Sequence, residues 1–402
     1  MTSWFSPGRI EVLGKHTDYA GGRSLIAALD RGVTATVTAE PDGAVAHSAA
    51  MPDEVDLRDP APLPSGHWGN YVKAAFTRLE LNFGALQPCR IEIDSTLPLA
   101  SGMSSSSAVV VASALALAHH NGLTSDPRWT AEITSDEALA TYLACVENGS
   151  GFGTLAGHTG VGTRGGSEDH TAMICSRPDE LGVFSFTDRV PARERTIAFP
   201  EDLRFVVVMS GVLAEKTGPA LAQYNRSSEL ARSIIAAWNA ATGRADANIG
   251  QALRSGADAR ADLTALVAQD ADLATRLEQF LVESEDIIPG AADALQRGDL
   301  GTFGALVDAS QRAADLGLGN QIDETRHLAA SARRQGAHAA SAFGAGYGGS
   351  VWALVRRPDA DAFATDWLGE YLAAYPQHAD TASVLVTRPR GGVRDVAPHL
   401  AG

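Results

Sequence analysis

Cysteine is scarce in this sequence: the 402 residues include three, Cys89, Cys145 and Cys175. Their spacing matches no zinc-binding pattern, and an odd number leaves at least one thiol without a partner. This usage is typical of a reducing compartment, so we expect a cytoplasmic protein. The N-terminal segment lacks a basic start followed by an apolar stretch, and no apolar run is long enough to cross a membrane. We therefore expect neither a signal peptide nor a transmembrane helix.

Positive charge is also in short supply. The chain has 32 Lys and Arg against 48 Asp and Glu, a formal net charge of −16, which disfavours nucleic acid or an anionic membrane as the main partner. A phosphate-bearing ligand remains compatible, because the free N–H groups at a helix N-terminus bind phosphate without a basic patch. The length is sufficient for two domains, and the 45% hydrophobic content is ordinary for a globular protein.

The hydrophobic pattern predicts an α+β protein with mixed sheets. Alternating residues at 32–39 and 90–94 predict strands, and shorter apolar runs at 172–175, 182–187 and 204–210 are interpreted as strands too. After about residue 212 the pattern changes to long alanine-rich helices, followed by two further strands. This order is not a regular alternation of strand and helix.

A serine-rich turn leads into an apolar helix predicted at 104–120. Gly102 and four consecutive serines, Ser104, Ser105, Ser106 and Ser107, would place several N–H groups and the positive end of the helix dipole around one point. Phosphate suits such a point, and a serine hydroxyl there can also bind Mg²⁺. The alternative is an ordinary serine N-cap, although four serines exceed what capping needs. The segment is not a P-loop, because no G-x-x-x-x-G-K-[ST] pattern occurs.

A glycine cluster at Gly344–Gly349 matches the G-x-G-x-x-G pattern of dinucleotide-binding proteins. That fingerprint follows a strand and opens a helix, whereas here a helical stretch precedes and a strand follows. An NAD-dependent oxidoreductase is therefore disfavoured. The cluster indicates a tight loop that another backbone or a ligand approaches closely.

Two polar loops carry the other chemically capable residues. Residues 8–22 combine Arg9, Lys15, His16 and Asp18 with turn-forming glycines, a set that suits the recognition of sugar hydroxyls. Asp169 closes a second glycine-rich stretch and could act as a general base. Taken singly, the first loop could be a solvated surface loop and Asp169 a turn residue.

Together these segments resemble, in order and spacing, the motifs of the GHMP kinases. The opening GRIEVLGKHTDYAGG resembles the signature of their galactokinase branch at every fixed position but one. Further similar stretches are Pro98–Ser106, Gly344–Gly349, Trp68–Lys73 and Tyr224–Arg226, so that the resemblance runs from residue 8 to residue 355.

The resemblance implies the two-domain GHMP kinase fold. Residues 1–200 would form an N-terminal domain of the ribosomal protein S5 domain 2-like type, and 201–402 a C-terminal α/β sandwich domain with the glycine-rich loop. It also implies an ATP-dependent, Mg²⁺-requiring kinase that transfers the γ-phosphoryl group to a monosaccharide, at the C1 hydroxyl of galactose or a close relative. The partner would be a small sugar, with no nucleic acid and no membrane.

The resemblance also assigns roles to individual residues. Asp169 would be the catalytic carboxylate, paired with Arg9, and His170 stands where the family usually has glutamine. The other implied roles are sugar binding by Lys15, His16, Asp18 and Tyr224, ATP binding by Gly102, Ser104, Ser105, Ser106 and Ser107, and Mg²⁺ binding by Ser106 and Glu147. The interval from Glu147 to Asp169 is longer than the family usually has.

Lys15 is the one departure in the opening signature, where the family has a glutamate that accepts hydrogen bonds near C6 of the sugar. Lysine only donates and carries the opposite charge. An acidic sugar such as galacturonate would suit it; alternatively Lys15 turns outward or pairs with a carboxylate such as Glu215, and galactose is still used. A catalytically silent, galactose-sensing relative is a further alternative, but the presence of both Arg9 and Asp169 argues against it.

Overall fold

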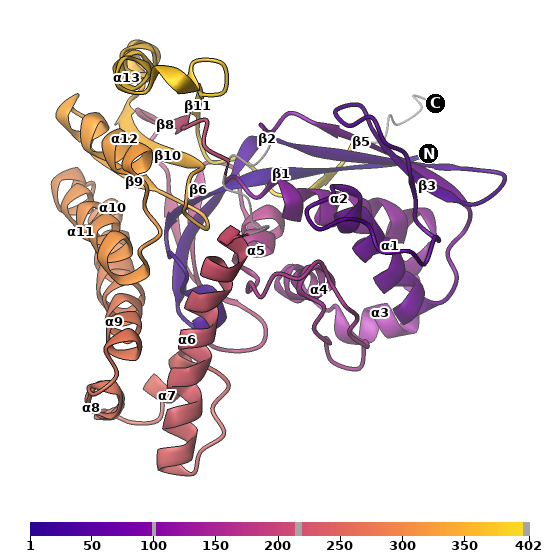
Figure 1. Cartoon of the computed structure of the whole chain (residues 1–402), viewed down its shortest axis with the longest axis horizontal. Coiled ribbons are helices and arrows are strands. Elements are labelled where there is room, and N and C mark those ends of the chain that lie inside the picture. The colour runs from indigo at the N-terminus through magenta and orange to yellow at the C-terminus, as the bar shows by residue number, and fades with distance from the viewer. Residues whose placement is uncertain (99–101, 214–218, 397–402) are drawn as a thin grey trace.

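The computed structural model describes residues 1–98, 102–213 and 219–396, with side chains of helix α6 described from residue 225 onward. It contains an eight-stranded sheet, formed by seven strands of the N-terminal half and one short strand near the C-terminus, and a four-stranded sheet formed in the C-terminal half. Figure 1 shows the two sheets side by side, each with its own layer of helices. Within the described ranges no helix is long and apolar enough to cross a membrane.

The larger sheet is built on two long antiparallel strands, β1 (Thr2–Leu13) and β2 (Arg23–Ala39). Its other strands are β3 (Ala44–Ser48), β4 (Val55–Asp56), β5 (Cys89–Ser95), β6 (Glu180–Ser185), β7 (Ala192–Ala198) and β12 (Arg394–Asp395). The strands predicted at 32–39 and 90–94 are thus confirmed, and they pair with each other. The loop between β1 and β2 contains the polar segment singled out in the sequence.

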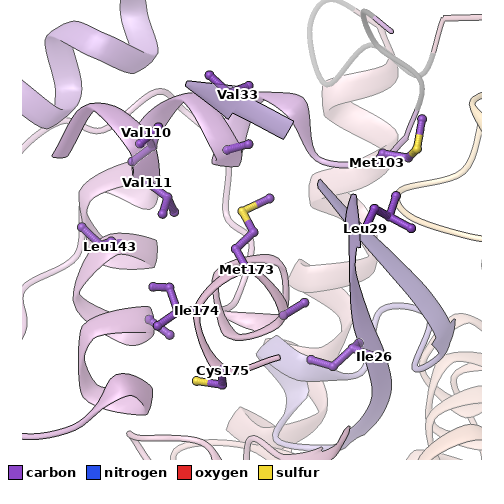
Figure 2. Close-up of a cluster of buried hydrophobic side chains, with 14 of the residues drawn as sticks. Ile26, Leu29, Val33, Met103, Val110, Val111, Leu143, Met173, Ile174 and Cys175 are labelled. Carbon is purple, nitrogen blue, oxygen red and sulfur yellow. The ribbon is translucent and has the colours of Figure 1, made fainter. Parts of the chain in front are cut away.

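Five helices cover one face of this sheet: α1 (Gly69–Phe83), α2 (Ser105–His120), α3 (Pro127–Glu132), α4 (Asp136–Asn148) and α5 (Glu168–Cys175). Helix α2 lies against β1 and β2 and is buried almost all round, which explains its apolar sequence. Figure 2 shows the core beside it, with Val110 and Val111 of α2, Leu143 of α4, Met173 of α5 and Ile26 of β2.

The strand predicted at 172–175 is wrong, because these residues form the second half of α5. Glu168 and Asp169 occupy the first turn of this helix, where negative charge is favourable next to the free N–H groups. The apolar residues that follow pack against α4 and β1. Tertiary packing therefore decides the structure of a run too short for its periodicity to do so.

The smaller sheet has the antiparallel order β11 (Ser383–Thr387), β8 (Leu203–Met209), β10 (Ser350–Arg356) and β9 (Ala339–Ala342). The helices of this half are α6 (Pro219–Thr242), α7 (Ile249–Leu253), α8 (Ala259–Val267), α9 (Ala271–Phe280), α10 (Ile288–Gln296), α11 (Leu300–Leu318), α12 (Asp323–Arg334) and α13 (Ala360–Ala374). A π-helical segment, Leu281–Ile287, joins α9 to α10 without a break. The α+β class is confirmed, while a domain boundary at residue 200 stays a prediction.

Candidate active site

A cavity lies where elements from both halves of the chain meet. Its wall is formed by β1, the β1–β2 loop, the beginnings of α2 and α5, the end of α4 and the glycine cluster. The polar side chains that line it are Arg9, Glu11, His16, Asp18, Tyr19, Ser107, Glu147, Asn148, Thr163, Glu168, Asp169 and His170. All four segments that the sequence singled out contribute to this wall, although they are far apart along the chain.

Arg9 and Asp169 form an ion pair at the wall of this cavity. The Arg9 Nε donates to Asp169 Oδ1 over 2.7 Å, and the exposed fractions of the two side chains are 3% and 17%. The Arg9 Nη1 also donates to the carbonyl of Gly102 over 2.6 Å, which ties the pair to the serine-rich turn. Burial opposes the charge on Arg9, but the neighbouring Asp169, Glu11 and Glu168 together raise its pKa, so it remains a cation.

The serine-rich turn presents unused hydrogen-bonding groups to the cavity. Ser104 adopts a left-handed conformation with φ of 58°, α2 begins at Ser105, and no side chain caps the first N–H groups of the helix. The buried hydroxyls of Ser104 and Ser107 have no hydrogen-bond partner in the described part of the chain. An anion at this point could accept hydrogen bonds from the free N–H groups and from these hydroxyls at the same time.

The glycine cluster closes over the serine-rich turn. Gly344 has φ of +78°, and a Cβ there would lie 2.9 Å from the carbonyl oxygen of Gly102. A residue with a side chain would therefore be strained and would push the two loops apart. The prediction of a loop that another backbone approaches closely is confirmed.

Glu147 and His170 face each other across the cavity wall. Glu147 Oε2 lies 3.2 Å from His170 Nε2, and both side chains are almost fully buried. Within the described ranges no group of three His, Cys, Asp or Glu side chains could hold a metal. A carboxylate and a serine hydroxyl are nevertheless oxygen donors of the kind that Mg²⁺ accepts when phosphate oxygens and water complete its shell. Ser106 and Glu147 fit that chemistry, and their role stays a prediction.

His16 and Asp18 line the same cavity from the loop between β1 and β2. The two nitrogens of His16 bond to Tyr19 Oη over 2.8 Å and to the carbonyl of Ala345 over 3.1 Å. Asp18 Oδ2 accepts the backbone N–H of Glu168 over 3.1 Å, which places the loop against the start of α5. The side chain of Tyr224, the fourth residue predicted to bind sugar, lies outside the described residues.

Lys15 requires a correction, because its ammonium group is not part of the cavity wall. The side chain is 1% exposed, and its Nζ donates to Ser310 Oγ over 2.9 Å. Ser310 Oγ in turn donates to Glu283 Oε1 over 3.0 Å, and this oxygen also accepts the N–H of Gly14. Lys15 thus neither contacts the cavity nor turns outward, and Glu215 lies outside the described residues. Its ammonium group is linked to the buried carboxyl group of Glu283 through the hydroxyl of Ser310.

Three polar residues of the C-terminal half, which the sequence analysis missed, hold the β1–β2 loop. Arg276 Nη2 donates to the carbonyl of His16 over 2.6 Å, and Gln279 Nε2 donates to that of Lys15 over 3.1 Å. Glu283 completes this set, and all three side chains are buried. Their spacing of three and four residues places them on one face of a helix, a signal that the sequence contained.

Glu11 and Glu168 are the second pair that the sequence analysis missed. They are 3% and 5% exposed, and Ser24 donates to Glu168 Oε2 over 2.5 Å. Because the two buried carboxyl groups repel each other when both are ionised, one of them is favoured to hold a proton. Burial raises the pKa of Glu11 to about 7, and burial with the charges of Glu11 and Asp18 raises the pKa of Glu168 well above its ordinary value.

This pair predicts a pH dependence of stability. The pKa of Glu11 is about 7 in the folded chain against an ordinary 4.5, so the folded state binds the extra proton between these values. The contribution of this proton to the free energy of unfolding is therefore fully present below pH 4.5 and is lost as the pH rises through 7. We expect Glu11→Gln to reduce the fall in the free energy of unfolding between pH 5 and 8 by about 2–3 kcal/mol. Urea unfolding at several pH values measures this, and identical pH dependence in both proteins would contradict it.

Comparison with known proteins agrees with this architecture. Family models match residues 70–154 as "GHMP kinases N terminal domain" and residues 291–374 as "GHMP kinases C terminal". A crystal structure of Lactococcus lactis galactokinase complexed with galactose superposes with a TM-score of 0.77 at 22% identity, covering 98% of this chain and 95% of that one. Streptococcus pneumoniae phosphomevalonate kinase superposes with a TM-score of 0.61 at 14% identity, covering 98% and 100% of the two chains. The fold and the two matched domains define a GHMP kinase.

The branch follows from the remaining matches. Residues 2–39 match the "Galactokinase galactose-binding signature". The galactokinase of Roseiflexus sp. (strain RS-1) is 25% identical over 393 residues, covering 96% of this chain and 91% of the relative. That of Mycobacterium bovis (strain BCG / Pasteur 1173P2) is 28% identical over 362 residues, covering 88% of each. The chain belongs to the galactokinase branch of the GHMP kinases and is a sugar kinase.

Proposed function

We propose that this chain transfers the γ-phosphoryl group of ATP to the C1 hydroxyl of galactose. The observation that carries the proposal is the Arg9–Asp169 pair, held between the serine-rich turn and the sugar-type loop at the wall of one cavity. The relatives named galactokinase support galactose as the substrate. A cytoplasmic location belongs to the same proposal and is supported by three buried free cysteines.

Each group of residues in the site has a separate role in phosphoryl transfer. The N-terminus of α2 and its serine hydroxyls bind the phosphates, while His16 and Asp18 orient the sugar. Asp169 then accepts a hydrogen bond or the proton of the attacking hydroxyl, and Arg9 offsets the negative charge that accumulates on the transferring group. Mg²⁺, held by Ser106 and Glu147, would supply further neutralisation of the phosphate oxygens when bound. Phosphoryl transfer depends on positioning and charge neutralisation, which this arrangement provides.

Galactose is favoured over galacturonate by the charges around the cavity. The ammonium group of Lys15, which motivated an acidic substrate, is bonded to Ser310 behind the wall. Among the described residues the wall contains five carboxyl side chains against one arginine, so that a sugar carboxylate would find little positive charge there.

We expect galactose to exceed galacturonate in kcat/KM by at least about a hundredfold, which corresponds to about 2.7 kcal/mol. An ADP-release assay with ATP, Mg²⁺ and each sugar measures this ratio. Equal or better turnover of galacturonate would contradict the proposal. Turnover of neither sugar, nor of any other hexose, would favour a silent sensing protein.

A further inference from the structure

One buried carboxylate oxygen at the cavity wall accepts no hydrogen bond from the described part of the protein. Glu11 is 3% exposed, it lines the cavity, and its Oε1 has no hydrogen-bond partner among the described residues. A buried carboxylate oxygen without a donor is unfavourable, so a structure that retains one generally has a use for it. The missing donor is therefore expected from a ligand.

Three donor-carrying residues on β1, on β2 and in the loop between them bond to groups other than Glu11. Arg9 directs Nε to Asp169 and Nη1 to the carbonyl of Gly102. The ammonium group of Lys15 bonds to Ser310, and the hydroxyl of Ser24 bonds to Glu168. The bonds of Lys15 and Ser24 are buried and those of Arg9 are partly buried, so the donating atoms cannot turn toward Glu11 without losing these partners.

Glu11 is also held in a defined position. It lies on β1 two residues after Arg9, and residues two apart on a strand share a face. Glu168, whose pKa is raised by burial and by the charges of Glu11 and Asp18, precedes Asp169 in the first turn of α5. The strand thus presents Arg9 and Glu11, and the helix presents Asp169 and Glu168. One ion pair and one carboxyl pair stand next to each other at the wall.

We propose that Glu11 is a substrate-binding residue whose Oε1 accepts a hydrogen bond from a sugar hydroxyl. It supplies the carboxylate acceptor that the signature places at position 15, where this chain has a lysine withdrawn to Ser310. This inference rests on the proposed function, because it assumes that the cavity binds a neutral hexose.

The test compares galactose with its 2-, 3-, 4- and 6-deoxy derivatives as substrates of the wild-type enzyme, Glu11→Gln and Glu11→Leu. We expect Glu11→Leu to raise the KM for galactose about 10- to 100-fold, the size of one hydrogen bond to a charged group, with kcat changed far less. One deoxy sugar of the series lacks the hydroxyl that Glu11 binds. This sugar should show the same KM with the wild-type enzyme and with Glu11→Leu. Glu11→Gln retains an acceptor oxygen and should fall in between. Glu92→Leu, on the half-exposed face of β5, is the matched control and should leave all KM values near wild type.

The possible results distinguish a wrong role for Glu11 from a wrong proposed function. A similar loss for galactose and all four deoxy sugars, or a loss confined to kcat, would show that Glu11 contacts no sugar hydroxyl and would overturn the inference. If Glu11→Leu does not fold, Glu11→Gln gives the same comparison with a smaller effect. Failure of the wild-type enzyme to phosphorylate galactose at all would instead refute the proposed function, and this inference with it.

Discussion

Asp169→Ala is expected to lower kcat about a thousandfold, the range typical of losing a general base, while ATP still binds. The reason is geometric: Asp169 is the carboxylate that pairs with Arg9 at the wall shared by the serine-rich turn and the sugar-type loop. Its removal takes away the group that orients the attacking hydroxyl but leaves the N-terminus of α2 intact. Steady-state kinetics with galactose, together with ATP binding by calorimetry, measure both halves of the expectation.

The matched control is Asp136→Ala. Asp136 is an exposed aspartate in the first turn of α4, as Asp169 is an aspartate in the first turn of α5, so both substitutions remove a negative charge from a helix N-terminus. Only the Asp169 variant should lose activity. Full activity in Asp169→Ala would show that the catalytic carboxylate lies elsewhere; the other acidic residues of the cavity wall are Glu11, Asp18, Glu147 and Glu168.

Lys15→Glu is expected to destabilise the fold by about 3–5 kcal/mol, the range measured when one partner of a buried charge pair is removed. The new carboxylate would be buried near Glu283 with Ser310 as the shared neighbour, and the cation that balances Glu283 would be gone. Adding Glu283→Gln in the same chain should recover part of the loss, because it removes the like charge. Denaturant unfolding of the single and double variants measures this recovery.

Lys73→Glu provides the control for charge reversal alone. The ammonium of Lys73 bonds to backbone carbonyls in an exposed region, so the change should alter stability by less than about 1 kcal/mol. If Lys15→Glu instead kept wild-type stability and lowered the KM for galactose, Lys15 would face the substrate and the structural assignment would be wrong.

The sequence was sufficient for the parts of the site that depend on local pattern. The serine-rich turn, the glycine cluster, Arg9 and Asp169 were identified from residue type and spacing, and the structure brings them to one cavity. The long strands and the apolar helix α2 were also predictable, because their periodicity extends over many residues.

The features of the site and the fold that could not be predicted depend on contacts between segments far apart in the chain. The partners of Lys15 are Ser310 and, through it, Glu283, more than 260 residues away, so that no local pattern could show which way the lysine points. Glu11 occupies a variable position of the signature, and its proximity to Glu168 is created by the packing of α5 on β1. The helical state of residues 172–175 likewise comes from that packing rather than from their composition.

The central claim is that the chain transfers a phosphoryl group from ATP to the C1 hydroxyl of galactose. Phosphorus NMR of a reaction containing the enzyme, galactose, ATP and Mg²⁺ tests it most directly, because the coupling of the product phosphorus identifies the carbon that carries it. We expect one sugar monophosphate, formed in equal amount with ADP and coupled to the anomeric proton, and its formation about a thousandfold slower with Asp169→Ala. Release of inorganic phosphate without a sugar phosphate, or a phosphate on another carbon, would contradict it.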